Sequence, residues 1–133
     1  MKIVIPGTAP SVNHMYENRA IRYTNKKGQA AMRRIKVLSR DAEHYQNLAI
    51  LLAKAWRTKN KWKPPDGKVI VNLWYFWPDN KKRDTHNTLK LLLDCLEAAQ
   101  IYTNDRYALP RIMDYEVDKK NPRVEIEIVE VIS

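Results

Sequence analysis

The sequence predicts a mixed α/β fold (mixed α+β), in which a small mixed sheet carries two main helices. Of the 133 residues, 44% are hydrophobic, which is enough for a buried core. Apolar residues recur at helical spacing in two segments, and five other segments combine β-branched or aromatic residues with flanking turn residues. No repeat or low-complexity linker interrupts the chain, so residues 1–133 are expected to form a single domain.

The N-terminal half predicts two short strands and a long helical region. The strand at residues 2–5 stops at Pro6-Gly7, and a second extended piece covers residues 20–24. Residues 29–57 contain no Gly or Pro and place apolar side chains at steps of three and four, which predicts an amphipathic helix or helix pair. The other face of this helix is predicted to form a cationic ridge of Arg33, Arg34, Lys36, Arg40, Lys54 and Arg57.

The C-terminal half predicts the centre of the sheet and the second helix. Residues 68–77 are rich in β-branched and aromatic side chains, which indicates a central strand. Residues 86–99 place leucines at positions i, i+3, i+4 and i+7 of one helical face. Two further strands are predicted at 111–117 and 123–131, and the last alternates apolar and polar side chains as in a sheet with one solvated face.

Positive charge is concentrated in the first half of the chain. Residues 1–68 hold 15 Lys and Arg against 4 Asp and Glu, whereas residues 69–133 hold 9 against 11, within a total net charge of +9. This excess favours a polyanionic partner, because each cation near a phosphate releases condensed counterions. We therefore expect nucleic acid, with lysines that only increase solubility as the alternative.

Several function classes are excluded by what the sequence lacks. Cys95 is the single cysteine and lies among leucines, so a buried inert thiol is expected, with no disulfide and no cysteine-rich zinc site. The glycines form no phosphate-cradling loop and the histidines lack zinc-site spacing, which argues against kinase, dinucleotide-binding and zinc-hydrolase classes and predicts no small-molecule cofactor. The first residues lack the apolar run of a signal peptide and no stretch is long enough for a membrane span, so a cytoplasmic location is expected.

The densest polar cluster begins where the central strand ends and runs into the second helix. His86, Lys90 and Asp94 stand four residues apart on one helical face, and Asp84 precedes the first turn. Asp105 lies in the loop after the helix, so the chain must bring it back for it to meet Asp84. Oxygen ligands that converge beside a basic surface suit Mg²⁺ and a phosphodiester.

Each of these residues also has a purely structural interpretation. Asp84 is a natural helix N-cap, and Lys90 with Asp94 forms an i,i+4 pair of a kind common on helix surfaces. Asp105 follows Thr and Asn in a sequence typical of a turn, and His86 in a first helical turn is typical of a solvated side chain. Spacing alone leaves both interpretations open.

The run RDTHNTLKLLLDCLEAAQIYTND, followed by two predicted strands, resembles the signature region of the RusA family of Holliday junction resolvases. That region typically reads R-D-x-D-N-x-x-K-x-x-x-D-x-L and continues into an acidic loop. The opening IPGTAPSVNHMY and the central strand also resemble this family. The likeness covers residues 1–16 and 66–131, whereas residues 25–63 match only in being helical and basic.

The resemblance implies a small homodimeric endonuclease that cuts four-way DNA junctions by Mg²⁺-dependent hydrolysis in recombination and repair, and it suggests a prophage origin. By position, it makes Asp84 and Asp105 metal-binding and catalytic, and Lys90 a contact to the phosphate or the transition state. Asp94 either binds metal or only orients Lys90. With the charge distribution, it leads us to expect DNA contacts from Lys81, Lys82, Arg83, Asn87, Asn13, Arg33, Arg34 and Arg40.

The sequence departs from the family at His86, where the commonest pattern has a second aspartate. Imidazole is a poor ligand for Mg²⁺ and suits Mn²⁺ better. Three roles of His86 are open: a hydrogen-bond donor while Asp84 and Asp105 hold the metal, a metal ligand that favours Mn²⁺, or a general acid or base. Two other functions stay as alternatives, a noncatalytic branched-DNA-binding protein, suggested by His86, and a basic RNA-binding α/β protein, suggested by the charge.

Overall fold

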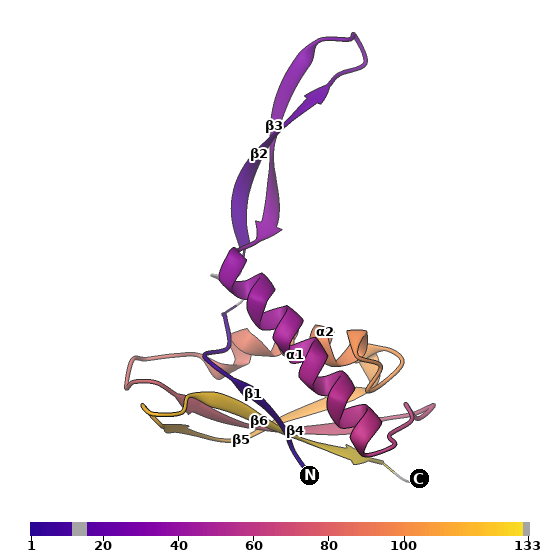
Figure 1. Ribbon diagram of the computed structural model, residues 1–133, viewed down its shortest axis with the longest axis vertical. Helices are drawn as coiled ribbons and strands as arrows, with labels where there is room; N and C mark the ends of the chain where they lie inside the picture. The colour runs from indigo at the N-terminus through magenta and orange to yellow at the C-terminus, as the bar shows by residue number, and fades with distance from the viewer. Residues whose placement is uncertain (12–15, 132–133) are drawn as a thin grey trace.

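The computed structural model describes residues 1–11 and 16–131, and its main layer is a four-stranded mixed sheet (Figure 1). The strands stand in the order β1 (Ile3–Pro6), β6 (Arg123–Glu130), β4 (Val69–Trp77) and β5 (Ala108–Val117). β4 is an interior strand that pairs antiparallel with β6 and parallel with β5. The predicted mixed class and the predicted central strand are therefore confirmed.

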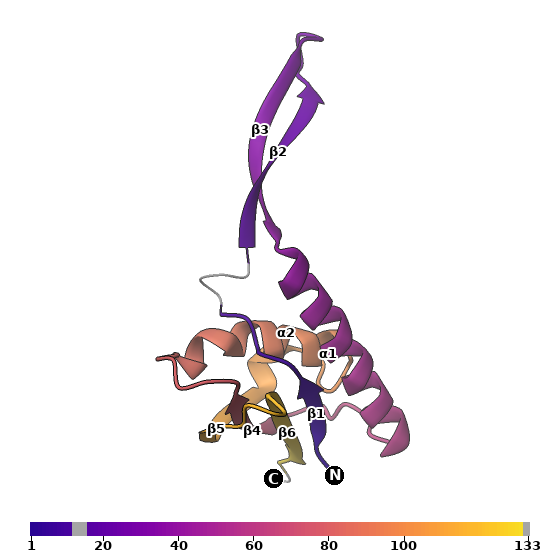
Figure 2. The same ribbon diagram turned by 60° about the vertical axis from the view of Figure 1, so that its left-hand side comes forward.

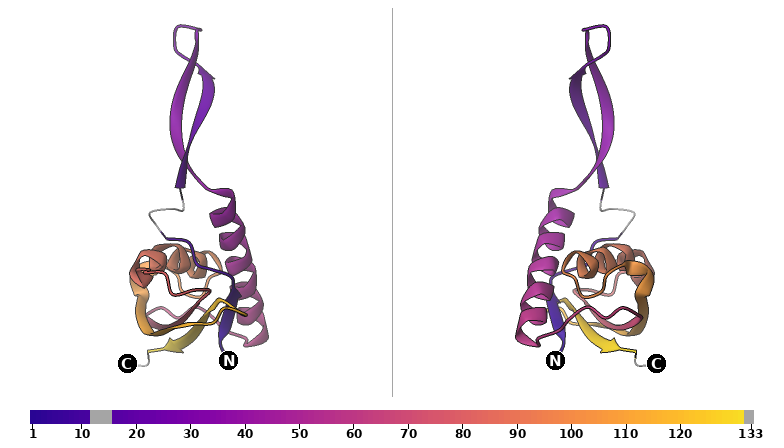
Figure 3. Two further views of the ribbon diagram at one scale, coloured as in Figure 1. Left: turned by 90° about the vertical axis from the view of Figure 1, so that its left-hand side faces the viewer. Right: turned by 90° about the vertical axis from the view of Figure 1, so that its right-hand side faces the viewer.

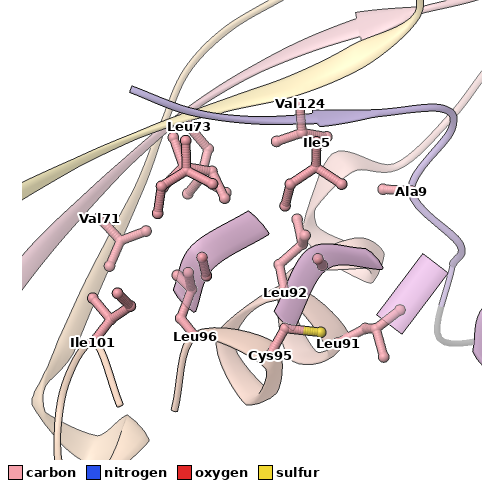
Figure 4. Packing of buried hydrophobic residues seen from close by; sticks show 14 of the residues in the cluster. Ile5, Ala9, Val71, Leu73, Leu91, Leu92, Cys95, Leu96, Ile101 and Val124 are labelled. Atoms are coloured by element: carbon pink, nitrogen blue, oxygen red, sulfur yellow. The ribbon is translucent and has the colours of Figure 1, made fainter. Parts of the chain in front are cut away.

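Both main helices, α1 (Arg40–Lys59) and α2 (Leu89–Ala98), lie on one face of this sheet (Figures 1 and 3). The core between helices and sheet consists of side chains that are almost completely buried, including Ile5, Val71, Leu73, Leu92 and Leu96 (Figure 4). Burial of this apolar surface stabilises the layers by about 25 cal/mol for each Å² removed from water. Within the described part of the chain, no helix is both long and apolar enough to cross a membrane.

β4 separates the two faces of the sheet. Alternate residues from Val69 to Trp77 are buried on the helix side, whereas the residues between them are half-buried on the opposite face. On that opposite face, Lys2 Nζ lies 4.0 Å from the ring centroid of Trp74, and the Arg123 guanidinium lies 3.8 Å from that of Phe76. Long cationic side chains therefore cover aromatic surface on the face turned away from the helices.

The prediction of a helix over residues 29–57 is wrong for its first third. β3 (Ala30–Leu38) pairs antiparallel with β2 (Tyr16–Thr24) along its whole length, and α1 begins only at Arg40. The strand predicted at 20–24 is confirmed but is longer than predicted. Arg33, Arg34 and Lys36 consequently lie on a strand, so the predicted helical ridge does not form as one surface.

The position of a helix cap explains where α1 starts. The Ser39 hydroxyl accepts a hydrogen bond from the Ala42 N–H at 3.2 Å, and Asp41 and Glu43 place negative charge in the first turn. Upstream of Ser39, cationic and apolar residues alternate with the period of a strand only over residues 34–37. This short alternation is hidden within the longer helical spacing, so the spacing alone favoured the wrong element.

β2 and β3 form a two-stranded hairpin that projects away from the four-stranded sheet (Figure 2). Hydrogen bonds close its turn, because Asn25 Oδ1 accepts from the N–H groups of Lys27 and Gln29 at 2.9 and 3.0 Å. Gly28 has a φ of 77°, a left-handed conformation that glycine adopts without strain. The hairpin is therefore specified by its own sequence, with little support from the sheet.

The second helix begins later than predicted. Residues Thr85–Thr88 form a 3-10 turn, η1, and α2 follows it directly. Asp84 is the N-cap of η1, since its Oδ1 accepts a hydrogen bond from the His86 N–H at 3.0 Å. The N-cap interpretation of Asp84 is therefore confirmed, and this role leaves its second carboxylate oxygen for other contacts.

A buried hydrogen bond ties η1 to β4. The hydroxyls of Thr88 and Tyr75 hydrogen-bond each other at 2.6 Å, and burial raises the pKa of Tyr75 to about 12. We expect Thr88→Val to lower the free energy of unfolding by about 1–3 kcal/mol, because it leaves the buried Tyr75 hydroxyl without this partner. Urea denaturation measures the loss, with Tyr75→Phe and the double variant as controls. Losses that simply add in the double variant would contradict a direct interaction.

Candidate active site

The loop of residues 78–84 leads from the end of β4 into η1 and is shaped by Asp79. The Asp79 carboxylate accepts two hydrogen bonds from the Arg83 guanidinium and one from the Lys81 N–H at 3.0 Å. The hydrogen bonds from Arg83 hold the pKa of Asp79 below its ordinary value. Arg83 also lies over Trp77, 5.0 Å from the ring centroid. These contacts stabilise the conformation of the loop, whose last residue is Asp84.

Two clefts, of about 680 and 480 Å³, flank this loop. Both are lined by the same five residues, Trp77, Lys81, Lys82, Arg83 and Asp84. The larger cleft is also lined by Asn80, Thr85, His86 and Tyr115, and the smaller one by residues 8–11, Asn87 and Thr88. The two lysines are exposed. The clefts therefore combine mobile positive charge with one carboxylate, a combination that suits a phosphate backbone.

Asp84 and His86 face each other at the start of η1. The Nδ1 atom of His86 lies 3.4 Å from Asp84 Oδ1. The His86 side chain is 78% exposed to solvent and the Asp84 side chain is 58% exposed. The same aspartate oxygen caps the turn. The two side chains lie within ion-pair distance of each other, and the role of His86 in the reaction stays a prediction.

A cluster of three carboxylates, here called the acidic cluster, lies toward the C-terminal end of α2. Asp94 and Glu97 stand three residues apart on this helix, and Asp105 begins the 3-10 turn η2 (Asp105–Tyr107). One carboxylate oxygen of each lies within 4.8 Å of the others. Asn104 caps η2, since its Oδ1 accepts from the Arg106 N–H at 2.9 Å. The turn therefore does not need the Asp105 side chain for its cap.

The surroundings of the acidic cluster favour a cation. Lys90 Nζ lies 3.5 Å from Asp94 Oδ2, which confirms the i,i+4 pair. Burial raises the pKa of Tyr102, and the negative charges of the acidic cluster raise it further. Carboxylates this close repel one another, and a divalent ion relieves the repulsion. Carboxylate oxygens are also the donors that Mg²⁺ and Mn²⁺ accept, so this donor set fits such an ion.

The structure divides the residues that the sequence placed in one metal site. Asp105 joins Asp94 and Glu97, whereas Asp84 and His86 pair with each other at the clefts. Among the described residues, Asp84, His86 and Asp105 do not form a group that closes within 4.8 Å. Their assignment as ligands stays a prediction. Sequence reasoning missed Glu97, although its spacing from Asp94 on an amphipathic helix was a usable signal.

The residues predicted to contact DNA lie in separate parts of the structure. The clefts are lined by Lys81, Lys82, Arg83 and Asn87. The hairpin strand β3 carries Arg33 and Arg34, and α1 begins with Arg40. Asn13 lies outside the described residues. Arg83 differs from the two cleft lysines, because its guanidinium is bound to Asp79.

The cysteine is isolated from the candidate site. Cys95 is buried in the core beneath α2 (Figure 4), and its Sγ lies 3.8 Å from the Gln46 carbonyl oxygen. Burial raises the pKa of the thiol to about 12, so the reactive thiolate is rare at neutral pH. The prediction that the thiol is buried is thereby confirmed.

The candidate site combines cationic clefts, a lysine and a cluster of carboxylates. This combination is typical of a nuclease, a hydrolase that acts on phosphodiester bonds. Comparison with protein families gives the same class, since a family model described as endodeoxyribonuclease RusA matches residues 6–129. The chain therefore belongs to the RusA endodeoxyribonuclease family, which confirms the resemblance seen in its residues. A search of curated proteins gives no significant match.

Proposed function

We propose that the chain is a structure-selective endonuclease that resolves four-way (Holliday) junctions by metal-dependent phosphodiester hydrolysis, in recombination and repair in the cytoplasm. The family match over residues 6–129 carries the proposal, because it covers both helices, the candidate site and every strand of the sheet except most of β1. The geometry supports it with cationic clefts for DNA and with the acidic cluster for metal. The acidic cluster and most lining residues of the clefts lie on the continuous segment that runs from β4 through α2 to η2.

The acidic cluster is proposed to hold the metal, Mg²⁺ or Mn²⁺. Asp105 belongs to this cluster and also to the ligand set that the family pattern predicts, so we assign it as a ligand on both grounds. A divalent ion bound there polarises a phosphate and lowers the pKa of water. Asp84 lines both clefts and is proposed to take part in catalysis from there. His86 is proposed to donate a hydrogen bond to the Asp84 carboxylate.

Lys90 is proposed to stabilise the negative charge that develops on the phosphate during cutting. Its ammonium group is exposed and lies 3.5 Å from Asp94, which orients it beside the acidic cluster. Lys81, Lys82 and Asn87 are proposed to hold the DNA strand in the clefts. Contacts of these residues to the phosphodiester backbone would position the strand without reading its base sequence.

A homodimer suits this substrate. A symmetric four-way junction offers two equivalent phosphates, and a two-fold dimer presents two equivalent sites to them. We therefore propose that two chains cut one junction in paired positions.

Cutting of a synthetic four-way junction, beside a linear duplex of the same sequence, tests this function with Mg²⁺, with Mn²⁺ and with EDTA. We expect paired symmetric nicks in the junction alone, and only when metal is present. His86→Asp is expected to leave the ratio of activity with Mg²⁺ to activity with Mn²⁺ nearly unchanged. A shift of this ratio toward Mg²⁺ would instead make His86 a metal ligand, because imidazole favours Mn²⁺. Tight junction binding without cutting under either metal would support the noncatalytic alternative. Tighter binding to RNA than to the junction would support the RNA-binding alternative.

A further inference from the structure

The hairpin of β2 and β3 carries most of the net positive charge of the protein. Residues 16–38 hold seven Lys and Arg and one Glu, a net of +6 within the total of +9. The hairpin projects away from the sheet and the helices in every view (Figures 1, 2 and 3), and none of its strand residues is buried. A two-stranded hairpin on its own is only marginally stable in water. Its length is therefore not explained by packing within this chain.

The two faces of the hairpin differ in chemistry. Directly opposed residues of an antiparallel pair share a face. The register places Arg22 opposite Met32, Arg34 opposite Ala20 and Lys36 opposite Asn18, all on one face. We call Arg22, Arg34 and Lys36 the cationic face. The other face carries most of the larger apolar side chains of the hairpin, namely Ile21, Tyr23, Ile35 and Val37.

The cations of the two faces also differ in their partners. On the apolar side, Arg19 pairs with Glu17 at 3.2 Å, and Arg33 lies over Tyr23, 5.8 Å from the ring centroid. The three residues of the cationic face are exposed, and none forms an ion pair with another residue in the described ranges. One face of the hairpin therefore presents three cations to solvent with no acidic neighbour on that face.

Duplex DNA matches this surface in charge and in size. The major groove admits a two-stranded ribbon, and strands of nine residues extend for about 30 Å. At about 3.4 Å for each base pair, that length follows the DNA for about nine pairs. Arg34 and Lys36 are two residues apart, about 7 Å, which is twice the axial spacing of the charges on one DNA strand.

We propose that the β2–β3 hairpin is a DNA-binding arm whose cationic face lies against the phosphates of a duplex at a distance from the clefts. The proposal rests on the proposed function, because it takes that duplex to be one arm of the junction. The arm contacts the phosphate backbone, so it adds affinity and orientation without reading a sequence. Cutting remains the task of the clefts and the acidic cluster.

Binding of a four-way junction in EDTA, over a series of salt concentrations, tests the arm. Arg22→Gln/Arg34→Gln/Lys36→Gln is expected to weaken binding by roughly 10- to 100-fold and to reduce the salt slope by about three. Lys59→Gln/Lys119→Gln/Lys120→Gln removes the same charge from exposed positions outside the hairpin and is expected to change both quantities much less. Arg22→Lys/Arg34→Lys keeps the charge and is expected to keep the slope. Circular dichroism verifies that each variant is folded.

Hydroxyl-radical footprinting locates the contact. The wild type is expected to protect a stretch of duplex beyond the crossover, and the cationic-face variant is expected to lose only that protection. The proposal is overturned if the cationic-face variant and the control variant bind with equal affinity and slope. It is also overturned if the substitutions weaken RNA binding alone, or if they change only the sedimentation of the DNA-free protein, which would indicate a contact between chains.

The same measurements separate this proposal from the proposed function. Binding in EDTA needs no cutting, so a protein that never cuts junctions but loses affinity through the cationic face contradicts the nuclease and retains the arm. A protein that cuts junctions, with a cationic-face variant that binds like the control, contradicts the arm and retains the nuclease.

Discussion

Asp105→Asn is expected to abolish junction cutting, with a fall in the single-turnover rate of at least about 100-fold. Asp105 is the carboxylate shared by the acidic cluster and the ligand set predicted from the family. The side chain is exposed, and Asn104 caps the turn that carries it, so the substitution removes the proposed ligand without disturbing the fold. Junction binding in EDTA is expected to stay close to that of the wild type.

Two further variants distinguish the two ligand sets. Glu97→Gln is expected to lower the affinity for Mn²⁺, measured by calorimetry, because Glu97 belongs to the acidic cluster. Asp84→Asn is expected to lower the cutting rate with a smaller effect on that affinity, because Asp84 lies at the clefts. Asp66→Asn, at an exposed position outside both groups, serves as the control. Full cutting by Asp105→Asn would rule out the acidic cluster as the metal site.

Lys90→Met is expected to slow cutting by about 100-fold while junction affinity changes little. The reason is that a cation aimed at developing charge contributes mainly in the transition state. The fold should tolerate the change, because an exposed i,i+4 pair such as Lys90 with Asp94 contributes only a few tenths of a kcal/mol. Single-turnover rates and EDTA binding curves measure the two effects separately.

Lys90→Arg and Lys63→Met are the matched variants. The arginine keeps the positive charge and is expected to recover part of the rate, whereas Lys63 is exposed on a loop and its loss is expected to be silent. A Lys90→Met protein that binds DNA weakly but cuts at the normal rate would make Lys90 a binding contact only. Equal losses from Lys90→Met and Lys63→Met would indicate a general effect of charge.

Local pattern was sufficient for the elements that pack on the core. β4 alternates buried and half-buried residues, and the leucines of α2 are spaced to cover one helix face, so each element shows its environment in its own sequence. The polar residues that follow β4 also keep the spacing of the family signature, which predicts the nuclease class from the sequence alone.

Long-range pairing decided what local pattern left ambiguous. Residues 30–38 continue the helical spacing and alternate like a strand only over residues 34–37, and the partner strand β2 satisfies their backbone groups in the extended form. The cationic residues that the sequence predicted on one helical ridge are therefore divided between two elements. Half of them lie on the hairpin that we propose as a DNA-binding arm, and the other half lie on α1.

The acidic cluster likewise depends on a turn after α2 that the sequence pattern did not predict. After α2, Gln100 adopts a left-handed φ of 62°, and the Ile101 N–H bonds back to the Leu96 carbonyl at 3.0 Å. This reversal returns the chain so that Asp105 meets Asp94 and Glu97. The sequence by itself determined the mixed fold class and the family, because residue pattern and spacing are local properties. Only the tertiary structure decided which carboxylates share one site, because that depends on how the chain turns between them.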